Sequence, residues 1–217
     1  MIPVVIVAGR NGSLAVVRTA DSVARQTVST AIVLSVSTGT HGPIGASLGS
    51  RHGADIAPAD SEAAAKNAAV QRTVSDRLLL VRAPWQLDPV MAERSTRILD
   101  SQPDVAVVVP ALRLQTAADS HSRILASSVS LPALLASPLE TPPVFMIRRQ
   151  TWDSAGGLEE CFGSLAFNEW WLRLLDAGAP IAHVEEPLGS LTAGPRDWWP
   201  ALSDEALHVV RFRAILE

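Results

Sequence analysis

The chain has 217 residues, of which 47% are hydrophobic and 18% charged, a balance typical of folded globular proteins and not of disordered ones. Its formal net charge of −4, without any block of like charge, gives no electrostatic footprint for nucleic acid. One cysteine, Cys161, excludes an intrachain disulfide, and the histidines lack the spacing of a metal site.

The first half of the chain alternates expected strands and helices, which is typical of an α/β domain. Short apolar or β-branched runs predict four strands, at residues 4–7, 31–34, 77–82 and 105–109. Three helices are expected between them, at residues 14–25, 61–74 and 88–101. Ser61 is a candidate N-cap for the second helix, and the Gly/Ser-rich segment 39–53 is expected to be a loop.

The second half carries weaker signals, and residues 115–141 carry almost none. Strands are expected at 144–148 and 181–184, and helices at 152–156, 168–177 and 204–216. Neighbouring helix residues point in different directions, so one of Trp170 and Trp171 is expected in the core and the other exposed. Trp198 and Trp199 are candidates for an interface.

Short matches in the right order resemble the family 2 glycosyltransferases of GT-A fold over about residues 3–195. They are Asn11, Ser22-Val23, Gln26-Thr27, Ala65-Lys66-Asn67-Ala68, Leu87 with Pro89 and Glu93, Arg148-Arg149, Gly156-Gly157, Trp171-Leu172-Arg173-Leu174 and Glu186-Pro187-Leu188. The resemblance implies an α/β fold with a GT-A-like (Rossmann-like) mixed central sheet and helices on both faces. It implies a single domain 1–217, with a nucleotide-binding half 1–110, an acceptor half 111–195 and a C-terminal helical extension 196–217.

The acidic residues that such enzymes use are absent at the matching positions. The Asp-x-Asp metal motif falls on Arg82 and Pro84, whose side chains offer no oxygen to a cation. The catalytic base falls near Ala166-Phe167, and a histidine that can bind the metal falls on Gly194. A hydroxyl in the segment Ser35-Val36-Ser37-Thr38 replaces the aspartate that contacts the nucleotide base. We therefore expect neither a metal site nor another cofactor.

The resemblance also implies a set of candidate nucleotide-binding residues: Ala8, Arg10, Asn11, Ser35, Lys66, Asn67 and Arg82. Arg82 stands where the metal would balance the diphosphate, and a guanidinium forms bidentate bonds to phosphate. Arg10 is a planar cation that suits stacking on a base, or solvation at the surface. Glu169 is the local candidate for a base that deprotonates an acceptor, although the helix dipole alone also favours a glutamate there.

Three functions remain open at this point. The leading one is a catalytically degenerate glycosyltransferase-like protein in glycan or glycoconjugate biosynthesis. It would bind a UDP-, GDP- or TDP-linked sugar weakly or not at all, and act through a partner glycosyltransferase or as a homodimer. The alternative is an active, metal-independent inverting transferase with Arg82 on the diphosphate and Glu169 as base. The third is a plain nucleotide- or glycan-binding module.

The expected location follows from the apolar segments. No apolar stretch reaches the roughly 18 residues that span a bilayer, and Met1 leads straight into an expected strand. We expect a cytoplasmic protein, with peripheral contact at the inner face of the membrane left open because many relatives act on lipid-linked acceptors.

Overall fold

The computed structural model describes residues 1–8, 13–37, 48, 51–116, 122–125, 129–136 and 141–193. The expected helix at 204–216, the tryptophan pair Trp198-Trp199 and Gly194 lie outside these residues. No helix in the described part is long and apolar enough to cross a membrane.

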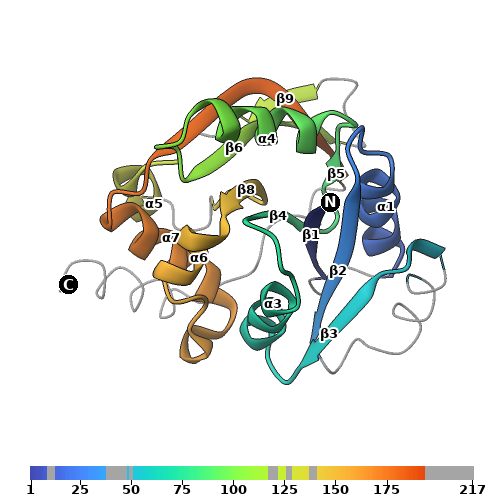
Figure 1. Cartoon of the computed structure of the whole chain (residues 1–217), viewed down its shortest axis with the longest axis horizontal. Coiled ribbons are helices and arrows are strands. Elements are labelled where there is room, and N and C mark those ends of the chain that lie inside the picture. The colour runs from blue at the N-terminus through green and yellow to red at the C-terminus, as the bar shows by residue number, and fades with distance from the viewer. Residues whose placement is uncertain are drawn as a thin grey trace.

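The described residues form one curled, mixed sheet of nine strands (Figure 1). The strands are β1 (Ile2–Val7), β2 (Thr30–Ser37), β3 (Asp55–Ala59), β4 (Arg77–Arg82), β5 (Gln86–Leu87), β6 (Val107–Thr116), β7 (Ser122–Leu125), β8 (Val144–Arg148) and β9 (Ile181–Ala193). Their order is β3-β2-β1-β4-β8-β6-β9-β5, and β7 pairs with β6. β1 to β4 are mutually parallel, and β8 lies antiparallel between β4 and β6.

Helices cover both faces of this sheet, as expected. They are α1 (Ser13–Ala24), α3 (Glu62–Gln71), α4 (Met91–Ser101), α5 (Leu131–Ala136), α6 (Arg149–Ser154), α7 (Ala166–Asp176) and the 3₁₀ helix η2 (Glu160–Leu165). The buried residues of α1 and α4 belong to one apolar cluster, and those of α3, α5, α6 and α7 belong to another on the opposite face. β1 is buried on both faces, which explains its continuous apolar sequence.

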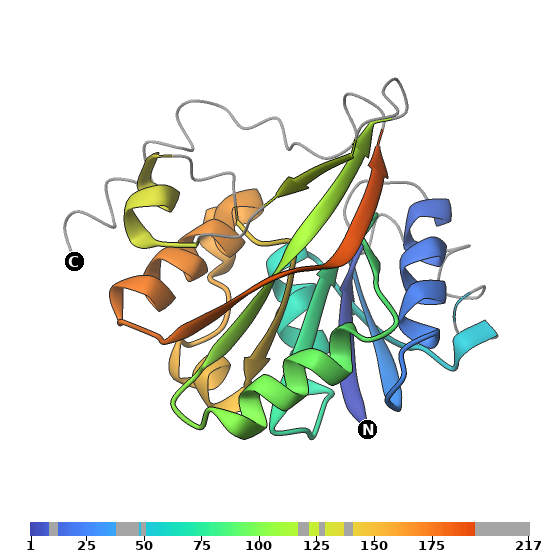
Figure 2. The same cartoon turned by 90° about the horizontal axis from the view of Figure 1, so that it is seen from above.

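The expected strands and helices that fall within the described residues are found, although α3 and α4 are shorter than predicted and several strands are longer. β9 continues to Ala193 and β6 to Thr116 because the two strands pair in parallel along most of their length (Figure 2). β6 crosses the predicted boundary at residue 110, so the two predicted halves share one sheet. β3 was not predicted, because its sequence Asp-Ile-Ala-Pro-Ala contains two residues that are rare in strands. β7 and α5 lie in the segment that carried almost no signal.

The expectation that one tryptophan of the pair Trp170-Trp171 is exposed is wrong, because both are fully buried. The ring centres of Trp170 and Trp152 lie 4.7 Å apart. The ring of Trp171 meets that of Phe145 edge-on, with 4.9 Å between the ring centres. α5 packs against α7 as well, so successive side chains of α7 both meet protein. A helix with two covered faces is recognised when its sequence is apolar all round, and the buried Asn168 and Glu169 interrupt that pattern in α7.

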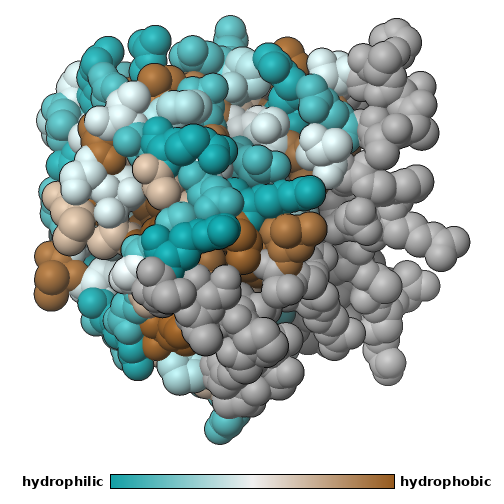
Figure 3. All heavy atoms as spheres, turned by 90° about the vertical axis from the view of Figure 1, so that its right-hand side faces the viewer, coloured by the Kyte–Doolittle hydropathy of each residue, from teal (hydrophilic) through white to brown (hydrophobic). Residues whose placement is uncertain are grey.

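The surface on the α1 side mixes hydrophilic and hydrophobic residues (Figure 3). In the described part, the exposed large hydrophobic residues are Met1, Leu14, Val74 and Ile124, which lie at separate places in the sequence. Single exposed hydrophobic residues are ordinary on a globular surface.

Candidate functional site

The order of the strands places a crevice at the carboxyl ends of β1 and β4. β2 and β3 lie on one side of β1 and β4 lies on the other, so the direction of winding changes between β1 and β4. Val7 is in register with both Ser35 and Arg82, and the Ala8 N–H donates to the Ser35 carbonyl at 3.2 Å. Ligands of open α/β sheets bind at such switch points.

Two basic side chains meet at this crevice. Lys66 on α3 is 4% exposed, and its Nζ lies 5.3 Å from the centre of the Phe167 ring. The guanidinium carbon of Arg82, at the end of β4, lies 5.5 Å from the same ring. The small hollow there is lined by Val7, Lys66, Leu80, Val81, Arg82, Pro143 and Phe167, and these side chains fill it so closely that a water molecule does not fit. Residues far apart in the sequence thus place two cations close to one aromatic ring.

Glu62 is the carboxylate that offsets these cations. Its Oε1 lies 2.8 Å from the Nζ of Lys66, one helical turn further along α3. Burial lowers the pKa of Lys66, Glu62 opposes this shift, and the charge of Arg82 adds to it. Burial also lowers the pKa of Arg82, against the opposing charge of Glu62. Two cations thus share one carboxylate among the described groups, a balance that favours an anionic ligand.

Asn67 follows Lys66 on α3, but its side chain binds the main chain of Leu158, next to the Gly156-Gly157 turn. Its amide nitrogen donates to the Leu158 carbonyl at 2.8 Å, and its amide oxygen accepts from the Leu158 N–H at 2.9 Å. Gly157 has a φ of +70°, and a Cβ built there would lie 3.0 Å from the Asn67 Oδ1. Asn67 therefore clamps the Gly156-Gly157 turn onto α3, and its role as a nucleotide contact stays a prediction.

Glu169 belongs to a second clamp on the same turn. Its two carboxylate oxygens accept from the Arg173 Nε and Nη2 at 2.6 and 2.9 Å, and its side chain is 4% exposed. Arg173 also donates to the carbonyls of Ala155 and Gly157. Glu169 thus orients an arginine that holds the turn, and its role as catalytic base stays a prediction. The position predicted for the family base carries Phe167, whose ring faces the two cations.

The matches along α1 form a brace under the segment that follows Arg82. The Thr19 hydroxyl donates to the Trp85 carbonyl at 2.8 Å, and the Ser22 hydroxyl accepts from the Leu87 N–H at 3.0 Å. Gln26 binds the main chain at Asp88 and Ala92, both at 2.8 Å, and Thr27 donates to Glu93 at 2.7 Å. Ser22, Gln26 and Thr27, which carry part of the resemblance, therefore help to build the scaffold.

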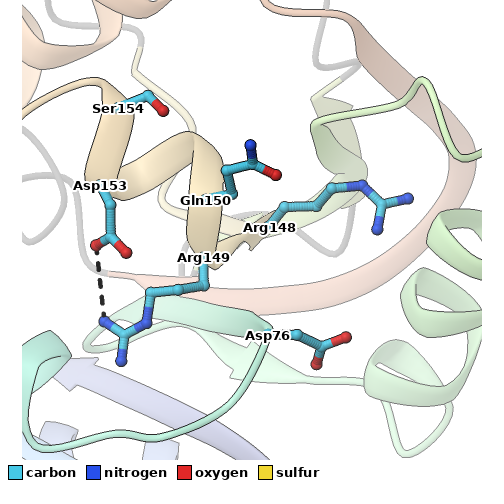
Figure 4. Close-up of a pocket in the computed structure, with 6 residues that line it drawn as sticks. All are labelled: Asp76, Arg148, Arg149, Gln150, Asp153 and Ser154. Carbon is cyan, nitrogen blue, oxygen red and sulfur yellow. Dashed lines mark ion pairs between the residues drawn. The ribbon is translucent and has the colours of Figure 1, made fainter.

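A separate hollow of about 670 Å³ opens at the far ends of β4 and β8 (Figure 4). Its arginines are engaged with helix ends. Arg148 donates to the Leu99 carbonyl of α4 at 2.6 Å, and Arg149 donates to the Val70 carbonyl of α3 at 3.0 Å. Arg149 also lies 4.0 Å from Asp153. Cations favour the carboxyl ends of helices, so we assign both arginines to anchoring these helices.

The predicted nucleotide site is thus brought together in part. Ala8, Ser35, Lys66 and Arg82 converge, Asn67 turns away, and Arg10 and Asn11 lie outside the described residues. In the part of the chain that the structure describes, no group of three His, Cys, Asp or Glu residues could hold a metal ion. Glu62 was overlooked, although its i,i+4 spacing to Lys66 is readable in the sequence. Phe167 had no sequence signal of its own.

Neither a family model nor a curated protein matches this sequence, whereas many solved structures resemble its fold. Residues 1–349 of S. aureus TarS, in complex with UDP-GlcNAc, superpose with a TM-score of 0.73 at 13% identity, covering 100% of this chain and 67% of that one. The complex of the same fragment with UDP gives 0.70 at 13%, covering 100% of this chain and 66% of that one.

A third structure is the mannosyltransferase PcManGT from Pyrobaculum calidifontis, in complex with GDP-Man and Mn²⁺. It gives a TM-score of 0.61 at 14% identity, covering 98% of this chain and 61% of that one. The chain therefore spans about two thirds of the TarS fragment 1–349, but 39% of the longer TarS chain and 61% of PcManGT. At such identities the comparisons show the fold, which is that of the GT-A glycosyltransferases, as the sequence motifs had suggested.

Proposed function

We propose that this domain binds the diphosphate of a nucleotide or nucleotide sugar at Lys66 and Arg82 without a divalent cation. The observation that carries this proposal is the meeting of both cations over Phe167 at the switch point of the sheet. A metal ion offsets the charge of a diphosphate, and two fixed cations in a partly dry crevice supply charge of the same sign. UDP, UDP-GlcNAc and GDP-Man in the similar structures support this class of ligand.

We further propose that the domain is catalytically degenerate, with a non-catalytic or partner-dependent role in glycan or glycoconjugate biosynthesis. Inverting transfer requires a base close to the acceptor hydroxyl. Glu169 is buried in a bidentate ion pair with Arg173, and to act as a base it would have to give up this pair. Phe167 takes up the space facing the cations and offers no proton acceptor. The active metal-independent transferase is therefore the less favoured reading.

Calorimetric titration with UDP, GDP and TDP, each with and without Mn²⁺, tests the binding proposal. We expect one of them to bind without metal, and Arg82→Ala to weaken it at least about tenfold, since charge-assisted phosphate bonds are strong. Arg97→Ala is the matched control, because Arg97 is 64% exposed on α4 and pairs only with Glu93 among the described residues. Absence of binding to all three, or binding only with Mn²⁺, would refute the proposal.

A turnover assay tests the proposal that the domain is catalytically degenerate. Purified protein is incubated with each cognate nucleotide sugar, and release of the nucleoside diphosphate is followed. We expect no release above the uncatalysed rate in wild type. Turnover that disappears in Glu169→Gln, while the melting temperature and nucleotide binding stay intact, would establish the transferase reading instead.

A further inference from the structure

Glu62 lies beside the proposed anion site and is partly exposed to solvent. It is the first residue of α3, directly after Ser61, whose hydroxyl caps the helix by accepting from the Ala64 N–H at 3.0 Å. The Glu62 side chain is 40% exposed, whereas the side chain of its partner Lys66 is 5% exposed. The carboxylate therefore remains in contact with solvent while it neutralises part of the charge of Lys66 and Arg82.

The contact between Glu62 and Lys66 is of the kind that a phosphate oxygen would make. An ammonium offers three hydrogen bonds, and here one of them goes to the Glu62 Oε1 at 2.8 Å. Protein covers almost all of the rest of Lys66, since the residue is 4% exposed. A phosphate that binds Nζ therefore competes with Glu62 for the same ammonium, and the two anions repel each other there.

We propose that Glu62 is an intramolecular competitor for this anion site and lowers its affinity for every phosphate ligand. This inference rests on the proposed function, because it concerns the same two cations. A phosphate that binds the Lys66 ammonium has to replace the Glu62 carboxylate there, so the loss of this ion pair lowers the net free energy of binding.

Metal-free calorimetric titrations with UDP and UMP on wild type, Glu62→Gln and Asp100→Asn test this inference. Asp100 is a matched control, since its carboxylate is 59% exposed and pairs with Arg77 at 2.8 Å, near the end of α4. Removal of the competing charge is expected to tighten UDP binding about tenfold in Glu62→Gln and to leave it unchanged in Asp100→Asn. The affinity for UMP should rise by a similar factor, because its phosphate no longer competes with the Glu62 carboxylate.

A second variant keeps the result interpretable. Glu62→Ala is measured as well, because alanine suits the first turn of a helix and guards against a fold defect of the glutamine variant. Melting curves confirm that both variants are folded.

The outcomes separate this inference from the function on which it rests. If wild type and Glu62→Gln bind UDP equally, the competitor role is refuted while the anion site stands. If both Glu62 variants bind more weakly than wild type, Glu62 positions Lys66 for the ligand, which also refutes it. If neither wild type nor any variant binds a nucleotide, the proposed function fails together with the inference.

Discussion

At the scale of one residue, Lys66 is a buried charged group that opposes folding. Its ammonium is almost fully buried, and burial lowers its pKa. Taking a charge out of water costs several kcal/mol, of which an ion pair returns only a part. A residue with such a cost is a candidate for function, since a packed apolar side chain would serve stability better.

Lys66→Met is therefore expected to stabilise the protein while it abolishes nucleotide binding. Methionine has a similar length and no charge to desolvate, and the partly exposed Glu62 can turn to water. We expect a gain of about 1 kcal/mol, which is a rise of roughly 2–4 °C in melting temperature for a domain of this size. Thermal melts and the UDP titration measure both effects. A loss of stability would show that Lys66 is mainly structural.

The same variant has a defined pH dependence. The folded-state pKa of Lys66 is lowered from its ordinary value of 10.5. Between the lowered pKa of the folded state and the ordinary pKa of the unfolded state, the unfolded chain binds more protons than the folded one. The stability of wild type therefore rises with pH in that window. The advantage of Lys66→Met should be complete below the lowered pKa and shrink as the pH approaches about 10. Urea unfolding at several pH values measures it, and a constant difference would contradict the assignment to this charge.

At the scale of elements, the turn before η2 is held by α3 and α7 together. Asn67 binds Leu158, while Arg173, oriented by Glu169, binds the carbonyls of Ala155 and Gly157. These contacts tie the end of α6 to the helix that carries Lys66. The turn therefore links the elements that supply Lys66 and Phe167.

Gly157→Ala is expected to loosen this link, and Gly178→Ala is its control. Both glycines have a φ of +70°, but a Cβ at Gly157 would press on Asn67 at 3.0 Å, whereas nothing lies within 4 Å at Gly178. The left-handed conformation costs an alanine about 1–2 kcal/mol at either site. Gly157→Ala should lose about 1 kcal/mol more, because the Asn67 bonds are disturbed. Urea unfolding compares them, and equal losses would contradict the clamp.

At the scale of the whole molecule, β4 joins the two apolar clusters. Leu79 and Val81 point into the cluster under α1 and α4, whereas Leu78 and Leu80 point into the cluster with α3 and α7. Alternate residues of a strand face opposite sides of the sheet, so one strand supports both cores. We therefore expect the described part of the chain to unfold as one cooperative unit.

Leu79→Ala tests this cooperativity. Truncation of a fully buried leucine is expected to cost about 2–5 kcal/mol, while Leu14→Ala, at a side chain that is 62% exposed, should cost under about 0.5 kcal/mol. Trp152, Trp170 and Trp171 lie in the opposite cluster from Leu79, whereas Trp85 lies in the same cluster, so tryptophan fluorescence reports on both. Tryptophan fluorescence and far-UV circular dichroism should therefore shift together in urea. Separate transitions would show that the two clusters unfold independently.

Much of this fold could be predicted because its signals are local. The apolar runs of β1, β4 and β8, the cap at Ser61 and the stop at Gly178 each depend on a few neighbouring residues. β3, β7 and α5 could not be predicted in this way, because the sheet and α7 provide the contacts that define them. The burial of both Trp170 and Trp171 could not be predicted either, because it also depends on contacts with other elements, such as the packing of α5 against α7.

The sequence by itself determined the α/β pattern and the GT-A-like order of motifs, and it led to the prediction that Arg82 and Pro84 stand at the positions of a metal motif. Only the tertiary structure decided which retained residues meet. It brought Lys66 to Arg82 and directed Asn67 and Glu169 to the turn before η2. The physical reason is that charge and size are properties of a residue, whereas burial and pairing depend on strands and helices that the sequence keeps far apart.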